Sequence, residues 1–111
     1  MNTEIVELKR CNVIKLNGRF DSNTGPQLEQ AFWQCTDAGV YRIVVDMSGV
    51  EFFSSAAIRI LIMAYKECRR WNRGDVRLAA IPERIAQVLD LAGILSFIET
   101  YPDTTLAVGS Y

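Results

Sequence analysis

Hydrophobic and polar residues follow two different periods along this chain. The short apolar run from Ile43 to Val45 is β-branched and ends at Asp46, which is typical of a buried strand. A segment that opens with Pro26 repeats its apolar residues at the helical spacing i, i+3, i+4, i+7, in Leu28, Ala31, Phe32 and Cys35. Segments of the two kinds alternate along the chain.

The complete pattern predicts a single α/β domain over residues 1–111. Turns are expected at Asn17-Gly18 and at Ser48-Gly49. Because helices alternate with strands, many strand pairs should be parallel, with right-handed crossovers. Strands are expected over 5–8, 12–16, 40–46, 75–81 and 97–99, and helices over 26–38, 56–73, 83–91 and, more briefly, 104–108.

Two serines stand at the start of the longest predicted helix. Ser54 and Ser55 directly precede a segment of high helix propensity without glycine or proline before Gly74, which predicts a helix of about five turns. A hydroxyl in this position is typical of a helix N-cap. The pattern therefore predicts a serine at the positive end of the helix dipole.

The same helix has two faces. Its apolar stripe, expected to be buried, comprises Ala57, Leu61, Ala64, Tyr65, Cys68 and Trp71. The opposite stripe is basic with one apolar member and comprises Arg59, Met63, Lys66, Arg70 and Arg73. This second stripe has two interpretations, a solvated helix face or a docking face for an acidic partner surface.

Composition narrows the function classes. The formal net charge of −1 argues against an electrostatic nucleic-acid or membrane binder, and no apolar run is long enough to span a bilayer. No export signal is visible at the N-terminus, which predicts a cytoplasmic protein. The chain has three cysteines, in no CxxC pair, and no histidine, so that zinc sites and Ser-His-Asp triads lack their parts and no cofactor is expected. The simplest interpretation of these cysteines is that they are three buried, reduced thiols without a functional role.

Three stretches of the sequence resemble the STAS domain, and within that superfamily the bacterial anti-sigma factor antagonists. They are residues 16–21 (LNGRFD), residues 44–50 (VVDMSGV) and residues 53–58 (FSSAAI). The resemblance covers nearly the whole chain. It implies a small α/β domain whose mixed, mostly parallel sheet has helices packed mainly on one face. It also implies partner switching, in which the unphosphorylated protein binds an anti-sigma factor kinase and is released when that kinase phosphorylates a serine.

Carried over by position, the resemblance implies that Ser55 is the phosphoacceptor. Ser54 stands where many relatives have aspartate, and Ala57 stands where they have glycine. Ser54 stays open as the alternative acceptor, because both serines lie within one residue of the predicted helix start and such boundaries are good to about two to four residues. A further alternative is that Ser55 merely caps the helix.

The leading hypothesis is a non-enzymatic, phosphorylation-controlled binding module. Its partners would be a serine kinase, which supplies the ATP, and a serine phosphatase, and the free protein would be a monomer or weak dimer. Ser54, Asp21 and Asp46 would set the surroundings of the switch, with Asp46 close to it if the following loop folds back. The partner face would comprise Arg59, Met63, Lys66 and Arg70.

Two other hypotheses come from different classes. In the first, this chain is a scaffold subunit of a larger assembly, such as a stressosome-like complex or a lipid-transporting ABC system, in which no phosphorylation occurs. In the second, it is a small-molecule-binding or enzymatic domain. The second lacks a glycine-rich phosphate loop and a metal-ligand cluster in the sequence.

Overall fold

The computed structural model describes residues 2–111, and its elements follow the predicted alternating order. Two single-turn 3₁₀ helices lie at Arg70–Asn72 and Ile94–Ser96. The strands and helices are β1 (Thr3–Glu7), β2 (Asn12–Phe20), α1 (Gly25–Asp37), β3 (Arg42–Phe53), α2 (Ser55–Arg69), β4 (Asp75–Ala79), α3 (Glu83–Leu91), β5 (Thr100–Tyr101) and α4 (Thr104–Gly109).

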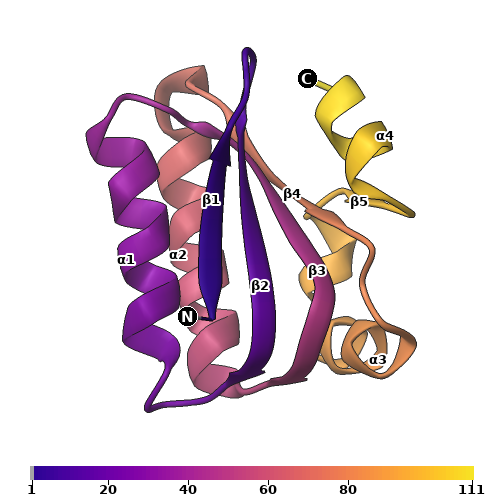
Figure 1. Ribbon diagram of the computed structural model, residues 1–111. Helices are drawn as coiled ribbons and strands as arrows, with labels where there is room; N and C mark the ends of the chain where they lie inside the picture. Colours follow the sequence, from indigo (N-terminus) through magenta and orange to yellow (C-terminus); the bar gives the residue numbers. More distant parts are fainter. Residues whose placement is uncertain (1) are drawn as a thin grey trace.

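The five strands form one mixed sheet in the order β1-β2-β3-β4-β5. β1 pairs antiparallel with β2, and the other three pairs are parallel. Helices α1 and α2 lie side by side against one face of the sheet (Figure 1). Their apolar residues share one core with those of α3, through Ile85 and Leu89. The predicted α/β class, with a mostly parallel sheet and helices mainly on one face, is confirmed.

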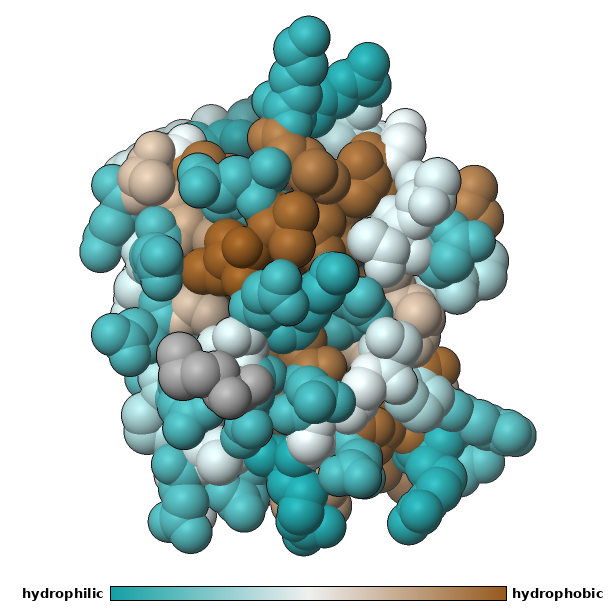
Figure 2. Space-filling view, in the orientation of Figure 1, coloured by the Kyte–Doolittle hydropathy of each residue, from teal (hydrophilic) through white to brown (hydrophobic). Residues whose placement is uncertain are grey.

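Helix α4 is the exception, because it packs on the opposite face of the sheet. A second, smaller core lies there and comprises Cys11, Val13, Val44, Ala79 and Ala107. Figure 2 shows an area of hydrophobic surface in the upper part of this face, within mainly hydrophilic surroundings. Val6 and Val108 pack against this second core and remain partly exposed. The small C-terminal helix thus covers only part of the face.

Two predicted turns are wrong, because β2 and β3 run straight through them. Asn17 pairs with Gly49, and the register of β2 against β3 shifts on both sides of that pair. A Cβ on Gly49 would lie 2.5 Å from Asn17 Oδ1 and 3.0 Å from the Leu16 carbonyl oxygen, so any larger residue would force the Asn17 side chain to move. Gly18 has φ +93°, which a bulge accommodates without ending the strand. These glycines therefore serve bulges and close packing instead of turns.

Two other expectations also need correction. α2 ends at Arg69, and Trp71, expected on its buried stripe, has φ +55° and is 77 % exposed. The last strand is at Thr100–Tyr101 instead of 97–99, because residues 94–96 form a 3₁₀ turn and Ile98 turns into the core. The three cysteines are buried and free, as predicted.

Candidate functional site

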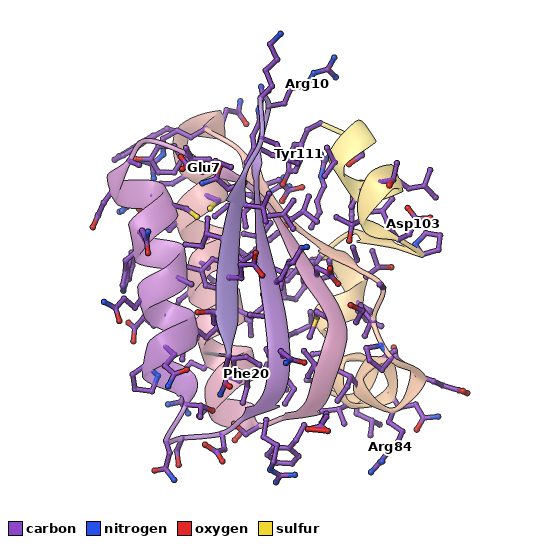
Figure 3. The ribbon with its side chains drawn as sticks, viewed as in Figure 1. Glu7, Arg10, Phe20, Arg84, Asp103 and Tyr111 are labelled. Carbon is purple, nitrogen blue, oxygen red and sulfur yellow. The ribbon has the colours of Figure 1, made fainter. Side chains whose placement is uncertain are left out.

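The candidate site lies where β2 and β3 end. Phe20 pairs with Phe53, and their buried rings pack with centroids 6.1 Å apart. The main-chain N–H of Ser54 donates a 2.8 Å hydrogen bond to the carbonyl oxygen of Phe20. Phe20 lies at the opposite end of the sheet from Arg10 and Tyr111 (Figure 3). Since parallel strands end at the same edge, the loops after β2 and β3 meet here, as do the N-termini of α1 and α2.

The two serines have different environments. Ser54 is the N-cap of α2, with extended backbone (φ −81°, ψ 171°), and its Oγ accepts a 3.3 Å hydrogen bond from the Ala57 N–H. Ser55 is the first residue of the helix and is exposed, and its hydroxyl makes no hydrogen bond with another described residue. The alternative in which Ser55 caps the helix is therefore wrong, and Ser54 is the cap.

Asp21 belongs to the same edge, directly after β2. Its carboxylate oxygen Oδ1 accepts hydrogen bonds from the Thr24 N–H (3.1 Å) and the Asn23 N–H (2.9 Å). These backbone donors, that of Thr24 first, hold the pKa of the Asp21 carboxyl below its usual range. The Asp21 carbonyl oxygen also accepts from the N–H of Gly25, at the start of α1. Asp21 therefore fixes the turn into α1 and brings a negative charge to the edge that carries Ser54.

Asp46 is not part of this edge. The expected loop after Asp46 does not exist, since β3 is continuous to Phe53 and places seven extended residues between Asp46 and Ser54. Eight residue steps at about 3.3 Å each separate the two residues by roughly 26 Å. The Asp46 Oδ1 instead accepts a 3.0 Å hydrogen bond from the Ser48 N–H within the strand. The expectation that Asp46 lies close to the serines is wrong.

The predicted partner face is exposed along α2. Arg59, Met63 and Lys66 on α2 are exposed, as is Arg70 directly after the helix end, and Met63 retains 44 % of its surface. Arg59 follows Ser55 by four residues, so the two side chains lie on one face of the helix. Arg73 does not continue this face. It lies beyond the helix, partly buried, with its guanidinium 3.8 Å from the Tyr41 ring centroid and an ion pair to Glu67.

Sequence reasoning missed the neighbour of Met63. A mainly apolar crevice between α1 and α2 is lined by Phe32, Trp33, Ile60 and Met63, and Glu29 and Glu67 also line it. Trp33 is 39 % exposed, and its Nε1 donates a 3.3 Å hydrogen bond to Glu29. The sequence does contain a sign of this crevice. Trp33 lies one position off the apolar stripe of α1, which indicates a large apolar side chain at the edge of the buried face. The crevice makes the exposed side of α2 partly apolar.

Residues 2–111 hold no group of three or more potential metal ligands from His, Cys, Asp and Glu. Over the same range, every helix is too short or too polar to cross a bilayer.

The family model described as "STAS domain" matches residues 2–107. The chain belongs to the STAS domain family. This family assignment agrees with the resemblance read from the sequence.

Two curated relatives of this STAS domain carry related names. The putative anti-sigma factor antagonist BtrV of Bordetella bronchiseptica is 28 % identical over 81 residues, which cover 73 % of this chain and 69 % of the relative. The anti-sigma-B factor antagonist of Staphylococcus epidermidis is 21 % identical over 94 residues, covering 85 % and 86 %.

Solved structures share its fold. An anti-sigma factor antagonist from Mycobacterium paratuberculosis superposes with a TM-score of 0.87 at 24 % identity, covering 97 % of this chain and 91 % of the other. The Bacillus cell fate determinant SpoIIAA in its phosphorylated form superposes with a TM-score of 0.75 at 15 % identity, covering 97 % of each chain. At these identities the similarity shows the fold.

Proposed function

We propose that this STAS domain is an anti-sigma factor antagonist that works as a non-enzymatic partner switch in the cytoplasm. In its unphosphorylated form it binds an anti-sigma factor with serine kinase activity. Phosphorylation of Ser55 releases it, and a serine phosphatase restores binding. The names of the curated relatives support the first part of this proposal. Three buried, unpaired thiols fit a reducing compartment.

The observation that carries the choice of Ser55 is the contrast between the two serines. The Ser54 hydroxyl is partly buried and its Oγ accepts the Ala57 N–H, so a kinase that reached it would have to disturb the helix cap. The Ser55 hydroxyl is exposed at the first helical position, where its reaction breaks no described hydrogen bond. A kinase active site can reach Ser55 without unfolding α2.

The reaction needs only a hydroxyl from this chain. Ser55 Oγ would attack the γ-phosphorus of ATP bound to the kinase, the bond from that phosphorus to the bridging oxygen would break, and ADP would leave. The kinase would take the hydroxyl proton. The phosphate then lies beside the free N–H groups of the first turn of α2, which stabilise negative charge. Arg59, one turn further on, adds a cation at the i+4 position.

Release follows from the charge that phosphorylation adds. The phosphate brings about −1.5 to −2 charges at pH 7 to an edge that already carries ionised Asp21. A complex that buries the neutral Ser55 hydroxyl would have to desolvate this dianion. The phosphate would also compete with acidic partner groups for Arg59. Both effects weaken the complex while leaving the fold intact.

Phosphopeptide mapping of the protein isolated from its own cells, with and without stress, tests the proposal. Trypsin releases residues 43–59, which contain Ser48, Ser54 and Ser55. We expect a condition-dependent phosphate on Ser55, assigned by fragment ions that separate it from Ser54. A peptide that is unmodified in every condition at full coverage would refute the switch and support the scaffold alternative, in which the domain is a constant subunit of a large assembly.

Binding measurements separate the same alternatives. Ser55→Asp should weaken binding of the kinase partner, and Ser55→Ala should retain it. Equal affinities of the two variants, together with a high-mass complex in native lysate, would contradict partner switching. Ser48→Asp, on an exposed position of β3 away from the helix, is the matched control for added charge and should bind as the unaltered protein does.

A further inference from the structure

The two edges of the sheet are protected differently. The β5 edge has only two residues, is followed by Pro102, and has α4 packed beside it. All three features discourage the addition of another strand. The β1 edge has five residues, and it contains no proline, lysine or arginine. Glu4 and Glu7 are its charged residues, and neither removes a main-chain donor or acceptor. Since an edge of this length that keeps all its main-chain groups can template strand addition, the β1 edge is the candidate interaction surface.

Two hydrogen bonds, one at each end of the β1–β2 pair, fix the direction in which each β1 residue forms its main-chain bonds. The Leu8 N–H donates to the Cys11 carbonyl and the Asn17 N–H donates to the Asn2 carbonyl, so even-numbered residues face β2. In an antiparallel pair these directions alternate, and the main-chain groups of Thr3, Ile5 and Glu7 therefore point away from the sheet. β2 is the only sheet neighbour of β1 among the described residues. Three N–H and three C=O groups are thus available along the edge.

The side chains of these residues point to the helix layer, where they meet α1. A groove of ≈ 400 Å³ between β1 and α1 is lined by Thr3, Ile5, Gln27, Gln30, Ala31 and Gln34. The three glutamines are spaced by three and four residues, so they share one exposed face of α1. Figure 3 places Glu7 at the end of this edge nearest the β1–β2 hairpin. The groove is therefore uncharged along α1 and carries a hydrophobic residue, Ile5, at its centre.

We propose that this edge binds β1 of a second copy of the chain, antiparallel, around a two-fold axis at Ile5. In that register Ile5 faces the partner's Ile5 and Thr3 faces the partner's Glu7. All three outward residues then form hydrogen-bonded pairs, and the two sheets join into one. This inference does not depend on the proposed phosphorylation of Ser55.

Charge complementarity selects a second copy over another occupant. The register places Glu4 opposite Val6 and Glu7 opposite Thr3, so no carboxylate lies directly opposite another. In a two-fold dimer the α1 helices face each other, and a charged face would repel its own copy. Gln27, Gln30 and Gln34 avoid this repulsion, because each amide both donates and accepts hydrogen bonds. The face is self-complementary in the way that an isologous interface requires.

Sedimentation velocity of the purified chain, up to about 1 mM, tests this dimer. We expect the 12.5 kDa monomer to convert to a species of twice that mass as concentration rises. Glu7→Pro removes an outward N–H and no bond to β2, so it should abolish the dimer while circular dichroism and thermal unfolding stay unchanged. A wild-type chain that stays monomeric over this range would overturn the proposal, whether or not an extended segment of another protein binds the edge.

A charge-swap experiment excludes misfolding as the cause. Gln30→Glu with Gln34→Glu should weaken dimerisation by about tenfold or more, and so should the corresponding double lysine variant. An equimolar mixture of the two variants should form heterodimers. Gln87→Glu, on the exposed side of α3, is the control and should dimerise normally. A dimer that persists in Glu7→Pro, or that is unaffected by charge on α1, would assign the contact to another surface and refute the proposal.

Discussion

The N–H of Ser54 donates a 2.8 Å hydrogen bond to the carbonyl oxygen of Phe20, which ties the end of β3 to the end of β2. The same residue then accepts the Ala57 N–H through its Oγ. Ser54 thereby fixes both the strand end and the helix start. Ser55, held one residue further on, is left with an exposed hydroxyl. Ser54 therefore has a structural role at the helix start, and Ser55 is the residue for which we propose phosphorylation.

This division predicts opposite sensitivities for the two serines. Ser54→Ala should lower the free energy of unfolding by about 1 kcal/mol, because it removes the N-cap. Ser55→Ala should change it by less than about 0.5 kcal/mol, because the side chain is exposed. Urea unfolding of both variants measures the difference. A larger cost for Ser55→Ala than for Ser54→Ala would contradict the assignment of the cap.

The sequence predicted the order of elements and the exposed face of α2 because both depend on local periodicity. It failed at Asn17-Gly18 and Ser48-Gly49, where the turn-like composition has a non-local cause. Asn17 and Gly49 lie opposite each other, and the glycine makes room for the Asn17 side chain across the two strands. The sequence of one strand does not show that its glycine is needed to fit a side chain on a neighbouring strand far away in the sequence.

Two further predictions, for Asp46 and for Trp71, are wrong because each extended a local pattern. Asp46 was expected near Ser55 only because a turn was expected after it, and the continuous β3 removes that turn. Trp71 was assigned to the buried stripe by extending the helical period, but the backbone leaves the helix at Arg70. Two guanidiniums instead lie near its ring, that of Arg70 at 4.9 Å and that of Arg73 at 5.1 Å from the centroid. Tertiary contacts decide such helix ends.

Asp21 gives the fold a defined acid sensitivity. Hydrogen bonds from Thr24 and Asn23 lower its pKa in the folded state, so its ionised form stabilises the fold above the unfolded pKa of about 3.9 and this contribution is lost as pH falls through the folded pKa. Wild type should therefore exceed Asp21→Asn in stability at about pH 7, and the gap should shrink below about pH 4. Urea midpoints at several pH values measure it.

Asp90→Asn is the control for this experiment, since it removes one exposed carboxylate from α3. Its effect at each pH corrects for the change in net charge. A gap between wild type and Asp21→Asn that is equally large under acidic and neutral conditions would mean that the charge of Asp21 does not act through the turn.

Arg59 should tune the phosphate at Ser55. In protein carrying phosphoserine at position 55, Arg59→Gln should raise the second pKa of the phosphate by about 0.2 to 0.4, since an i,i+4 ion pair contributes about 0.3 to 0.5 kcal/mol. Phosphorus NMR titration measures this value. Lys66→Gln is the matched control. Lys66 follows Ser55 by eleven helical residues, about 16 Å along the axis, and at that distance salt largely screens its charge from the phosphate. An equal effect of both variants would remove Arg59 from the site.

Tyr111 should contribute to stability through its hydroxyl. The hydroxyl oxygen accepts a 3.1 Å hydrogen bond from the Ile43 N–H, and the O–H lies 2.6 Å from the Asp75 carbonyl oxygen. Burial raises the pKa of the phenol, which keeps the proton in place as a donor. Tyr111→Phe leaves the Ile43 N–H without this partner and should cost about 1 to 3 kcal/mol in urea unfolding. Tyr101→Phe loses only an exposed bond to Glu99 and should cost less than about 0.5 kcal/mol. Equal costs would show that the link from Tyr111 to β3 and β4 adds nothing beyond the packing of its ring against Arg77.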